Sequence, residues 1–142
     1  WDARDRLQVT LPNIVQHAGA HFGDSMDYVE FENAGGYRDD ARMQELVRGI
    51  LLEDRIFNGE IMSYPAPGKR LYRSAISLAL LEDTGWYFPD YSVAEALPWG
   101  LGQGRDFFHT PCNLMPLTGS HYACPTAVYP LQGQLFSLSV AT

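Results

Sequence analysis

The chain has 142 residues, enough for one small domain with a hydrophobic core. Hydrophobic residues make up 46% of it and charged residues 19%, a balance that excludes an intrinsically disordered chain. The formal net charge is -7, and Lys69 is the single lysine, so a nucleic-acid partner, which would need clustered basic side chains, is not expected. No apolar run reaches the ~18 residues of a transmembrane segment.

The N-terminus and the cysteines bear on processing and compartment. The chain begins at Trp1 rather than at methionine and shows no signal peptide, so we expect a processed product or a piece of a longer protein. The two cysteines, Cys112 and Cys124, are close in sequence. A short disulfide loop between them would indicate an oxidising compartment, whereas two free buried thiols are an equally simple interpretation.

The first part of the chain predicts a strand, a helix and a loop. Residues 7–11 alternate apolar and polar side chains, as expected for a short strand. Pro12 then suits the first turn of a helix that covers residues 13–22. Residues 23–36 are interpreted as a solvated acidic loop, because their carboxylates lack the regular ligand spacing of a calcium site.

A second helix is expected from Asp39 or Asp40, either of which can cap it, to about Leu52. Apolar side chains at helical spacing form one stripe along this segment, which we expect to face the core. The stripe consists of Met43, Leu46, Val47, Ile50 and Leu51.

The middle of the chain predicts a tight turn followed by a third helix. Asn58-Gly59 is a strong turn signal, and the turn that it begins carries Met62. Residues 71–83 have helical periodicity, and Gly85 follows them as a C-terminal cap. The side chains expected to face inward are Ile76, Ala79 and Leu80.

The last part of the chain carries weaker signals. Residues 92–95 have the form of a capping box and predict one helical turn. From residue 102 onward Gly, Pro and Thr are frequent, and residues 131–140 are interpreted as a late strand. The whole pattern predicts an α-rich α+β fold with three main helices and long ordered loops.

Two sets of side chains could carry function but are more simply explained by structure. His17 and His21 are one helical turn apart, which is metal-ligand spacing, yet Ala18 stands where an H-E-x-x-H zinc motif has its glutamate. We therefore expect surface or capping roles for both histidines. The aromatic side chains after the third helix are expected to fill a core, whereas an open shelf of them would favour a carbohydrate- or adhesion-type binding module. They are Trp86, Tyr87, Phe88 and Tyr91.

Three sequence blocks carry a resemblance to a known family. The blocks are His21-Phe22-Gly23 with Val29-Glu30-Phe31-Glu32-Asn33-Ala34-Gly35-Gly36; Ile56-Phe57-Asn58-Gly59-Glu60-Ile61-Met62; and Ala79-Leu80-Leu81-Glu82-Asp83-Thr84-Gly85-Trp86-Tyr87 with Tyr91-Ser92-Val93-Ala94-Glu95 and Leu97-Pro98-Trp99-Gly100. Together they resemble the leishmanolysin family of zinc metallopeptidases, which are metzincins, and the resemblance covers roughly residues 9–112. A turn with a methionine followed by a helix is how metzincins build the floor of their metal site. The resemblance therefore implies that this chain is the C-terminal portion of a leishmanolysin-like fold, with Met62 in the Met-turn.

The resemblance also implies where zinc would bind. In the family, two histidines of H-E-x-x-H hold the metal with a third histidine eleven residues before the turn methionine. The chain contains no H-E-x-x-H, and the third-ligand position is occupied by Leu51, which has no lone pair to offer. Glu53 or Asp54 could substitute in principle, since carboxylates bind zinc. We expect no catalytic residue and no metal site in this chain.

Two pairs of residues are expected to replace or supply cross-links. Family members carry a cysteine after His-Phe-Gly and another after Pro-Trp-Gly, and the resemblance implies that the two are bonded. Asp24 and Arg105 occupy these positions here, so we expect a salt bridge in place of the disulfide. The family's use of disulfides also favours a bond between Cys112 and Cys124 and a location outside the cytoplasm, whether extracellular, cell-surface or lumenal.

The expected function is a non-catalytic, leishmanolysin-like module that acts as a structural or protein-interaction component of a larger assembly. Residues 1–111 would form the leishmanolysin-like subdomain, and residues 112–142 a tail with a possible disulfide loop and terminal strand. Its partners would be other protein chains or the N-terminal part of the same precursor, and no cofactor is expected. The alternative is a part of an active zinc metalloendopeptidase whose H-E-x-x-H segment lies on another chain or fragment.

Overall fold

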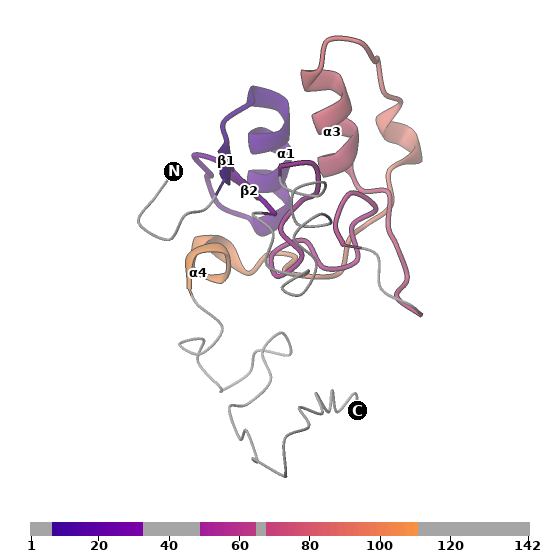
Figure 1. Ribbon diagram of the computed structural model, residues 1–142. Helices are drawn as coiled ribbons and strands as arrows, with labels where there is room; N and C mark the ends of the chain where they lie inside the picture. The colour runs from indigo at the N-terminus through magenta and orange to yellow at the C-terminus, as the bar shows by residue number, and fades with distance from the viewer. Residues whose placement is uncertain (1–6, 33–48, 65–67, 111–142) are drawn as a thin grey trace, which may run out of the picture. The chain divides into compact units, whose positions relative to one another are not determined.

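The computed structural model describes residues 7–32, 49–64 and 68–110, and the chain divides into two units, Trp1–Phe108 and His109–Thr142. The described residues form few helices and a small two-stranded sheet, an α+β arrangement in which helix predominates (Figure 1). Among them, no helix is long and apolar enough to cross a membrane. The elements are β1 (Leu7–Val9), α1 (Pro12–Phe22), β2 (Val29–Phe31), α3 (Ala75–Asp83), the 3-10 helix η1 (Tyr91–Val93) and α4 (Gly104–His109).

Helix α1 begins and ends at the residues that its sequence indicates. Pro12 occupies the first turn, where its missing N–H group would have no helical partner in any case. Gly23 ends the helix in the left-handed conformation, with φ 76°, and its N–H donates to the carbonyl of Gly19 at 2.9 Å. The buried side chains recur every four residues, at Ile14, Ala18 and Phe22, and form the face that packs inward.

Helix α3 packs against α1, and its last residue caps the first turn of α1. The N-cap position of α1 is Leu11, whose apolar side chain offers no hydrogen bond. The carboxylate of Asp83 takes over this role, accepting from the backbone nitrogens of Asn13 at 3.1 Å and Ile14 at 2.8 Å. These N–H groups belong to the first turn, which lacks helical acceptors, and a negative charge is favourable there. One side chain therefore satisfies α1 and joins it to α3.

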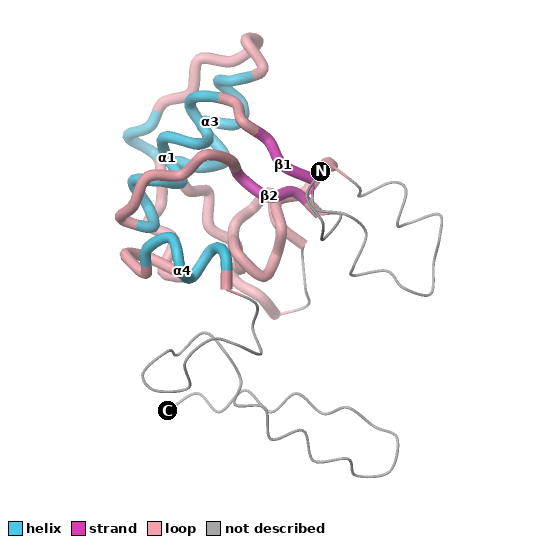
Figure 2. Tube along the Cα trace, turned by 90° about the vertical axis from the view of Figure 1, so that its left-hand side faces the viewer, coloured by secondary structure: helices cyan, strands magenta, loops and turns pink. Residues whose placement is uncertain are grey.

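Strands β1 and β2 lie side by side (Figure 2), and isolated bridges extend their pairing through Leu52. Strands β1 and β2 pair antiparallel, with Leu7 opposite Phe31 and Val9 opposite Val29. Phe31 then pairs with Leu52, and Leu52 pairs in parallel with Ser63. The segment that holds Met62 is thus attached to the sheet.

Strand β2 corrects the prediction of a loop over residues 23–36. All three residues of β2 are buried, so the strand shows no alternation of exposed and buried side chains. A short strand that is covered on both faces gives no period-2 signal in the sequence. The rest of that predicted loop from residue 33 onward lies outside the described residues.

The predicted helix up to Leu52 is wrong at its C-terminal end, and residues 39–48 lie outside the described residues. Gly49 has a left-handed φ of 73° and lies in a turn, and residues 51–53 are hydrogen-bonded to β2. Ile50 is 56% exposed, whereas Leu52 is fully buried. Pairing with β2, which is distant in sequence, therefore outweighs the local helical periodicity at this end of the segment.

Helix α3 is shorter at its start than its apolar pattern predicts. Residues 71–74 are not helical, because Tyr72 pairs with Glu60 and Ser74 is the N-cap, accepting from the backbone nitrogen of Ile76. Ile76 and Ala79 are buried as predicted, and Gly85 follows the helix with a left-handed φ of 73°.

Two short helices follow α3. The predicted turn at residues 92–95 is displaced to η1, and Asp90 rather than Ser92 caps it. Helix α4 was not predicted, although it buries Phe107 and Phe108.

Substitution of Asp83 tests whether one carboxylate holds α1 to α3. We expect Asp83→Ala to lower the free energy of unfolding by about 1–2 kcal/mol, the usual cost of losing a helix N-cap. Asp83→Asn keeps one acceptor oxygen and should lose less. Urea unfolding followed by circular dichroism would measure both, with Asp90→Ala, which removes an exposed cap, as the control. Equal stability of Asp83→Ala and the native chain would contradict this role.

Candidate functional site

The Met62 turn is a series of tight turns held by its own backbone. The N–H of Glu60 donates to the carbonyl of Phe57 at 2.9 Å, and the N–H of Ser63 donates to the carbonyl of Glu60 at 3.0 Å. Gly59 has φ 90°, a conformation that side chains disfavour, which confirms the predicted turn. The carbonyl of Met62 accepts from the N–H of Leu52 at 2.8 Å. All of these bonds lie within the chain, so the turn is complete as a backbone structure without a bound metal.

A buried carboxylate fastens this turn to helix α3. The side chain of Glu60 is fully buried, and its carboxylate accepts from the backbone nitrogen of Ser74, 3.3 Å from the nearer oxygen. Ser74 is the N-cap of α3, so the negative charge lies at the positive end of the helix. Burial raises the pKa of Glu60, against the hydroxyls of Ser77 and Ser74 and the nearby N–H groups. Sequence reasoning missed this contact, because its partners are distant in the chain.

Leu51, at the position that the resemblance implies for the third ligand, lies in the extended segment beside β2. Its carbonyl accepts from the N–H of Glu32 at 2.8 Å. Leu52 is fully buried while Leu51 is half-buried, and successive side chains of an extended segment point to opposite faces. The interpretation of Leu51 as part of a helical core stripe is therefore wrong.

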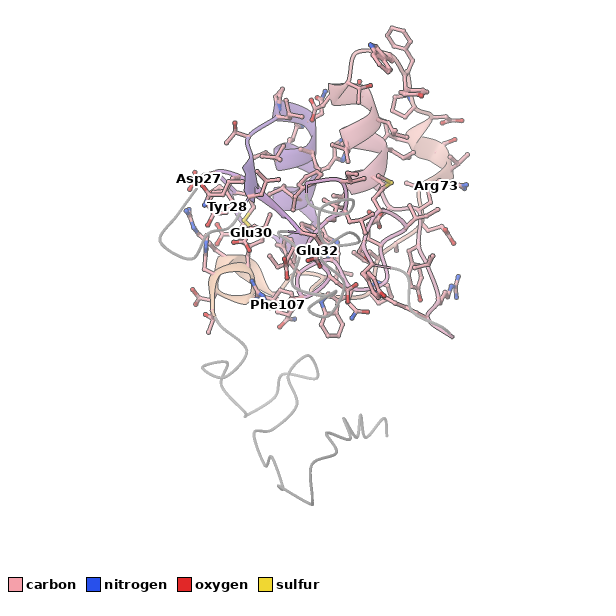
Figure 3. The ribbon with its side chains drawn as sticks, viewed as in Figure 1. Asp27, Tyr28, Glu30, Glu32, Arg73 and Phe107 are labelled. Atoms are coloured by element: carbon pink, nitrogen blue, oxygen red, sulfur yellow. The ribbon has the colours of Figure 1, made fainter. Side chains whose placement is uncertain are left out.

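The face on which Leu51 lies is acidic. Because Phe31 pairs with Leu52, the register places Glu32 opposite Leu51 and Glu30 opposite Glu53. Glu30 is buried, and its carboxylate lies 3.8 Å from the guanidinium of Arg55. Figure 3 shows Glu30 and Glu32 in the middle of the view, with Phe107 of α4 below them.

The two carboxylates considered as substitute ligands have different surroundings. Asp54 forms an ion pair with Lys69, and its N–H donates to Glu32 at 3.1 Å. Burial raises the pKa of Glu53 to about 7, and the negative charge of Glu32 adds to the effect. Within the described ranges, no group of three or more His, Cys, Asp or Glu side chains could hold a metal ion.

The two histidines of α1 have separate structural partners. The ring of His17 stacks on that of Tyr91, with 4.7 Å between the centroids and an angle of 8°. Nε2 of His21 lies 2.8 Å from the carbonyl oxygen of Trp99, which can only accept, so this nitrogen carries the proton. Burial lowers the pKa of His21, although the bond to Trp99 opposes the shift. Both rings are thus used in packing α1 against the later part of the chain.

Asp24 and Arg105 lie side by side, and Asp27 joins them. The backbone N–H of Arg105 donates to Asp24 Oδ2 at 3.3 Å, and the guanidinium of Arg105 pairs with Asp27. The other oxygen of Asp24 accepts from the N–H of Ser25 at 2.7 Å. Cys112 and Cys124 lie outside the described residues, so their bond stays a prediction.

The aromatic residues after α3 are mostly outside the core, which corrects the core interpretation. Trp86 is 84% exposed, Phe88 is 97% exposed, and more than half of Tyr87 is accessible. Tyr91 differs, because its ring stacks on His17 and its hydroxyl donates to Glu82. The open shelf therefore consists of Trp86, Tyr87 and Phe88.

The raised pKa of Glu53 predicts a stability that depends on pH. A carboxyl whose pKa is higher in the folded chain than its ordinary 4.5 binds its proton more tightly there, so stability is fully present below about 4.5 and falls as the pH rises through about 7. We expect a loss of about 1–2 kcal/mol between pH 5 and pH 8, after allowance for solvent screening.

Glu53→Gln should remove most of this loss, while Glu95→Gln, on the exposed carboxylate near Arg70, should leave it unchanged. Urea unfolding at a series of pH values would measure the effect. An identical pH profile for Glu53→Gln and the native chain would show that Glu53 does not titrate in this range.

Comparison with known proteins places these features in a family. The sequence model described as leishmanolysin matches residues 4–126 of the chain. A leishmanolysin-like peptidase of Caenorhabditis briggsae is 38% identical over 112 residues, which are 76% of this chain and 15% of that protein. Leishmanolysin of Leishmania major is 32% identical over 111 residues, covering 78% of this chain and 17% of that protein.

A leishmanolysin-like peptidase of Drosophila melanogaster shows the same pattern, with 33% identity over 109 residues, 74% of this chain and 14% of the relative. The chain thus spans well under a fifth of the length of the curated relatives that it matches. The family model nevertheless covers most of the chain, including the Met62 turn, α3 and the segment of Trp99. The chain belongs to the leishmanolysin family.

Proposed function

We propose that this chain is a non-catalytic module of the leishmanolysin family and serves as a structural or protein-interaction component of a larger assembly. The observation that carries the proposal is Leu51, an aliphatic side chain at the third-ligand position of the family. A catalytic zinc needs three protein ligands and an open position for water. Leu51 offers no donor atom, and the nearby carboxylate of Asp54 is already paired with Lys69.

The retained scaffold supports this proposal. Glu60 fastens the Met62 turn to α3, and Asp83 fastens α3 to α1, by hydrogen bonds within the chain. In a metzincin-type site the turn methionine lies beneath the metal, whereas Met62 here would fill space as a flexible apolar residue. A module of this kind keeps the architecture of the peptidase without the donor set.

The same proposal extends to location and partners. The leishmanolysin resemblance favours a place outside the cytoplasm, at the cell surface or in a lumen. The partners would be other protein chains or the N-terminal part of the same precursor. An acidic chain with a net charge of -7 is suited to protein contacts rather than to nucleic acid.

The alternative is that the chain completes an active zinc metalloendopeptidase. The names of the relatives favour it, since they include leishmanolysin-like peptidases and a ciliated left-right organizer metallopeptidase of Mus musculus. It requires an H-E-x-x-H segment on another chain or fragment and a donor in place of Leu51.

A zinc and protease assay separates the two functions when it is done on the precursor or assembly that contains the chain, because the chain alone lacks H-E-x-x-H under either proposal. The purified assembly, supplied with zinc, is expected to retain less than one equivalent of the metal after gel filtration and to leave denatured casein uncut, because Leu51 offers no third ligand. The measurements are metal analysis by mass spectrometry and gel electrophoresis of the casein. Cleavage of casein that 1,10-phenanthroline abolishes would refute the non-catalytic proposal, and a leishmanolysin preparation serves as the positive control.

We further propose that the contact of Asp24 with Arg105 replaces a disulfide. The double substitution Asp24→Cys with Arg105→Cys should then form a disulfide under oxidising conditions and raise the free energy of unfolding by about 2–4 kcal/mol. Chemical denaturation with and without dithiothreitol would measure the gain. The native chain under both conditions controls for Cys112 and Cys124, and failure of the new cysteines to oxidise would contradict the proposal.

A further inference from the structure

Trp86, Tyr87 and Phe88, here called the aromatic loop, lie between α3 and η1, at the top of Figure 1. The backbone on either side is held in place. The N–H of Trp86 donates to Thr84 Oγ1 at 3.2 Å, and Asp90 caps η1 by accepting from the N–H of Ser92 at 2.9 Å. The aromatic side chains are therefore displayed from a fixed turn rather than from a loose end.

The exposed aromatic surface of the loop is large enough to form the centre of a protein–protein interface. A large aromatic side chain buries roughly 150–250 Å² when it is covered. Together the three offer on the order of 400 Å², about half of the roughly 800 Å² that each partner contributes to a specific interface. Tryptophan and tyrosine are also the residues that most often dominate binding energy.

Three carboxylates flank the aromatic loop in the sequence, and each accepts hydrogen bonds within the chain. Glu82 accepts from the hydroxyl of Tyr91, Asp83 from the first turn of α1, and Asp90 from the N–H of Ser92. The hydrogen bonds from Ser92 lower the pKa of Asp90, which keeps it negatively charged at neutral pH. Arg73 donates to the carbonyl of Val93, at the opposite end of η1 from Asp90, and leaves the carboxylates in excess.

This surrounding charge decides among the possible occupants. A second copy of the chain would bring two acidic rims together, and an anionic membrane would meet the same repulsion. A neutral glycan could stack on the rings but has no positive charge to pair with the carboxylates. A polypeptide with lysine or arginine next to apolar side chains could pack its apolar groups on the rings and pair its basic groups with the carboxylates.

We propose that the aromatic loop is the docking surface for a polypeptide segment that carries basic residues beside apolar ones. This inference rests on the proposed function as an interaction module and adds the surface and the chemistry of the partner. The aromatic rings pack against the apolar side chains of this segment, and its basic side chains face Glu82, Asp83 and Asp90.

A displayed library of random 12-residue peptides, selected against the full chain, tests the proposal. We expect the enriched peptides to combine lysine or arginine with leucine or aromatic residues. Synthetic copies should bind at least tenfold more weakly to the double variant Trp86→Ser with Phe88→Ser, measured by fluorescence anisotropy. Because both residues are exposed, the variant should fold normally, which circular dichroism verifies.

The matched control is Ile50→Ser with Leu101→Ser, which removes two other exposed apolar side chains and should leave peptide binding unchanged. Selection of peptides that bind both variants equally, or of acidic peptides, would overturn the proposal. The native chain and the aromatic variant are also compared for binding to phosphatidylcholine vesicles, for binding to chitohexaose and for self-association. If the native chain shows one of these and the variant loses it, the surface belongs to a membrane, a glycan or a second copy, respectively, and the proposal is wrong. Zinc-dependent proteolysis would remove the non-catalytic function without altering any of these results.

Discussion

The buried carboxylate of Glu60 is the interaction on which the arrangement around Met62 depends. It lies with no exposed surface at the N-terminus of α3, next to the N–H of its N-cap Ser74. A buried carboxylate without such partners would be strongly destabilising, whereas one placed at a helix N-terminus is compensated by the N–H groups and the helix dipole. The turn that carries Met62 is therefore tied to helix α3 through a side chain of the turn itself.

Charge is distributed unevenly over the described unit, and the distribution has structural causes. On the face of Leu51, the strand register brings Glu30, Glu32 and Glu53 together, and burial leaves one of them with a pKa of about 7. Next to the aromatic loop in the sequence, Asp83 caps α1, Asp90 caps η1, and Glu82 accepts a hydrogen bond from the hydroxyl of Tyr91. The first group makes the face on which Leu51 lies acidic, and the second places carboxylates on both sides of the exposed rings in the sequence.

Local signals in the sequence predicted the parts of the fold that local physics decides. Pro12 and Gly23 bound α1, Gly59 marks the turn, and Gly85 follows α3, because each of these positions depends on backbone conformations that neighbouring residues do not alter. Strand β2 and the extended segment at Leu52 were missed, since each is stabilised by a partner some twenty residues away. The exposure of Trp86 and Phe88 could not be predicted from the sequence either, because large aromatic residues occur both in protein cores and at exposed binding surfaces. By contrast, the leucine at position 51, where the resemblance implies a zinc ligand, is evident from the sequence alone.

The cap that Asp83 provides has a consequence for the order in which the protein folds. The two ends of this contact are separated by 70 residues. The side-chain cap of α1 therefore forms only after the polypeptide has closed a long loop and α3 has formed, and water bonds to the N–H groups of the first turn until then. Closing such a loop is entropically costly and slows folding. During synthesis, α1 leaves the ribosome before Asp83 has been translated, so the helix lacks this cap until the later residue is available.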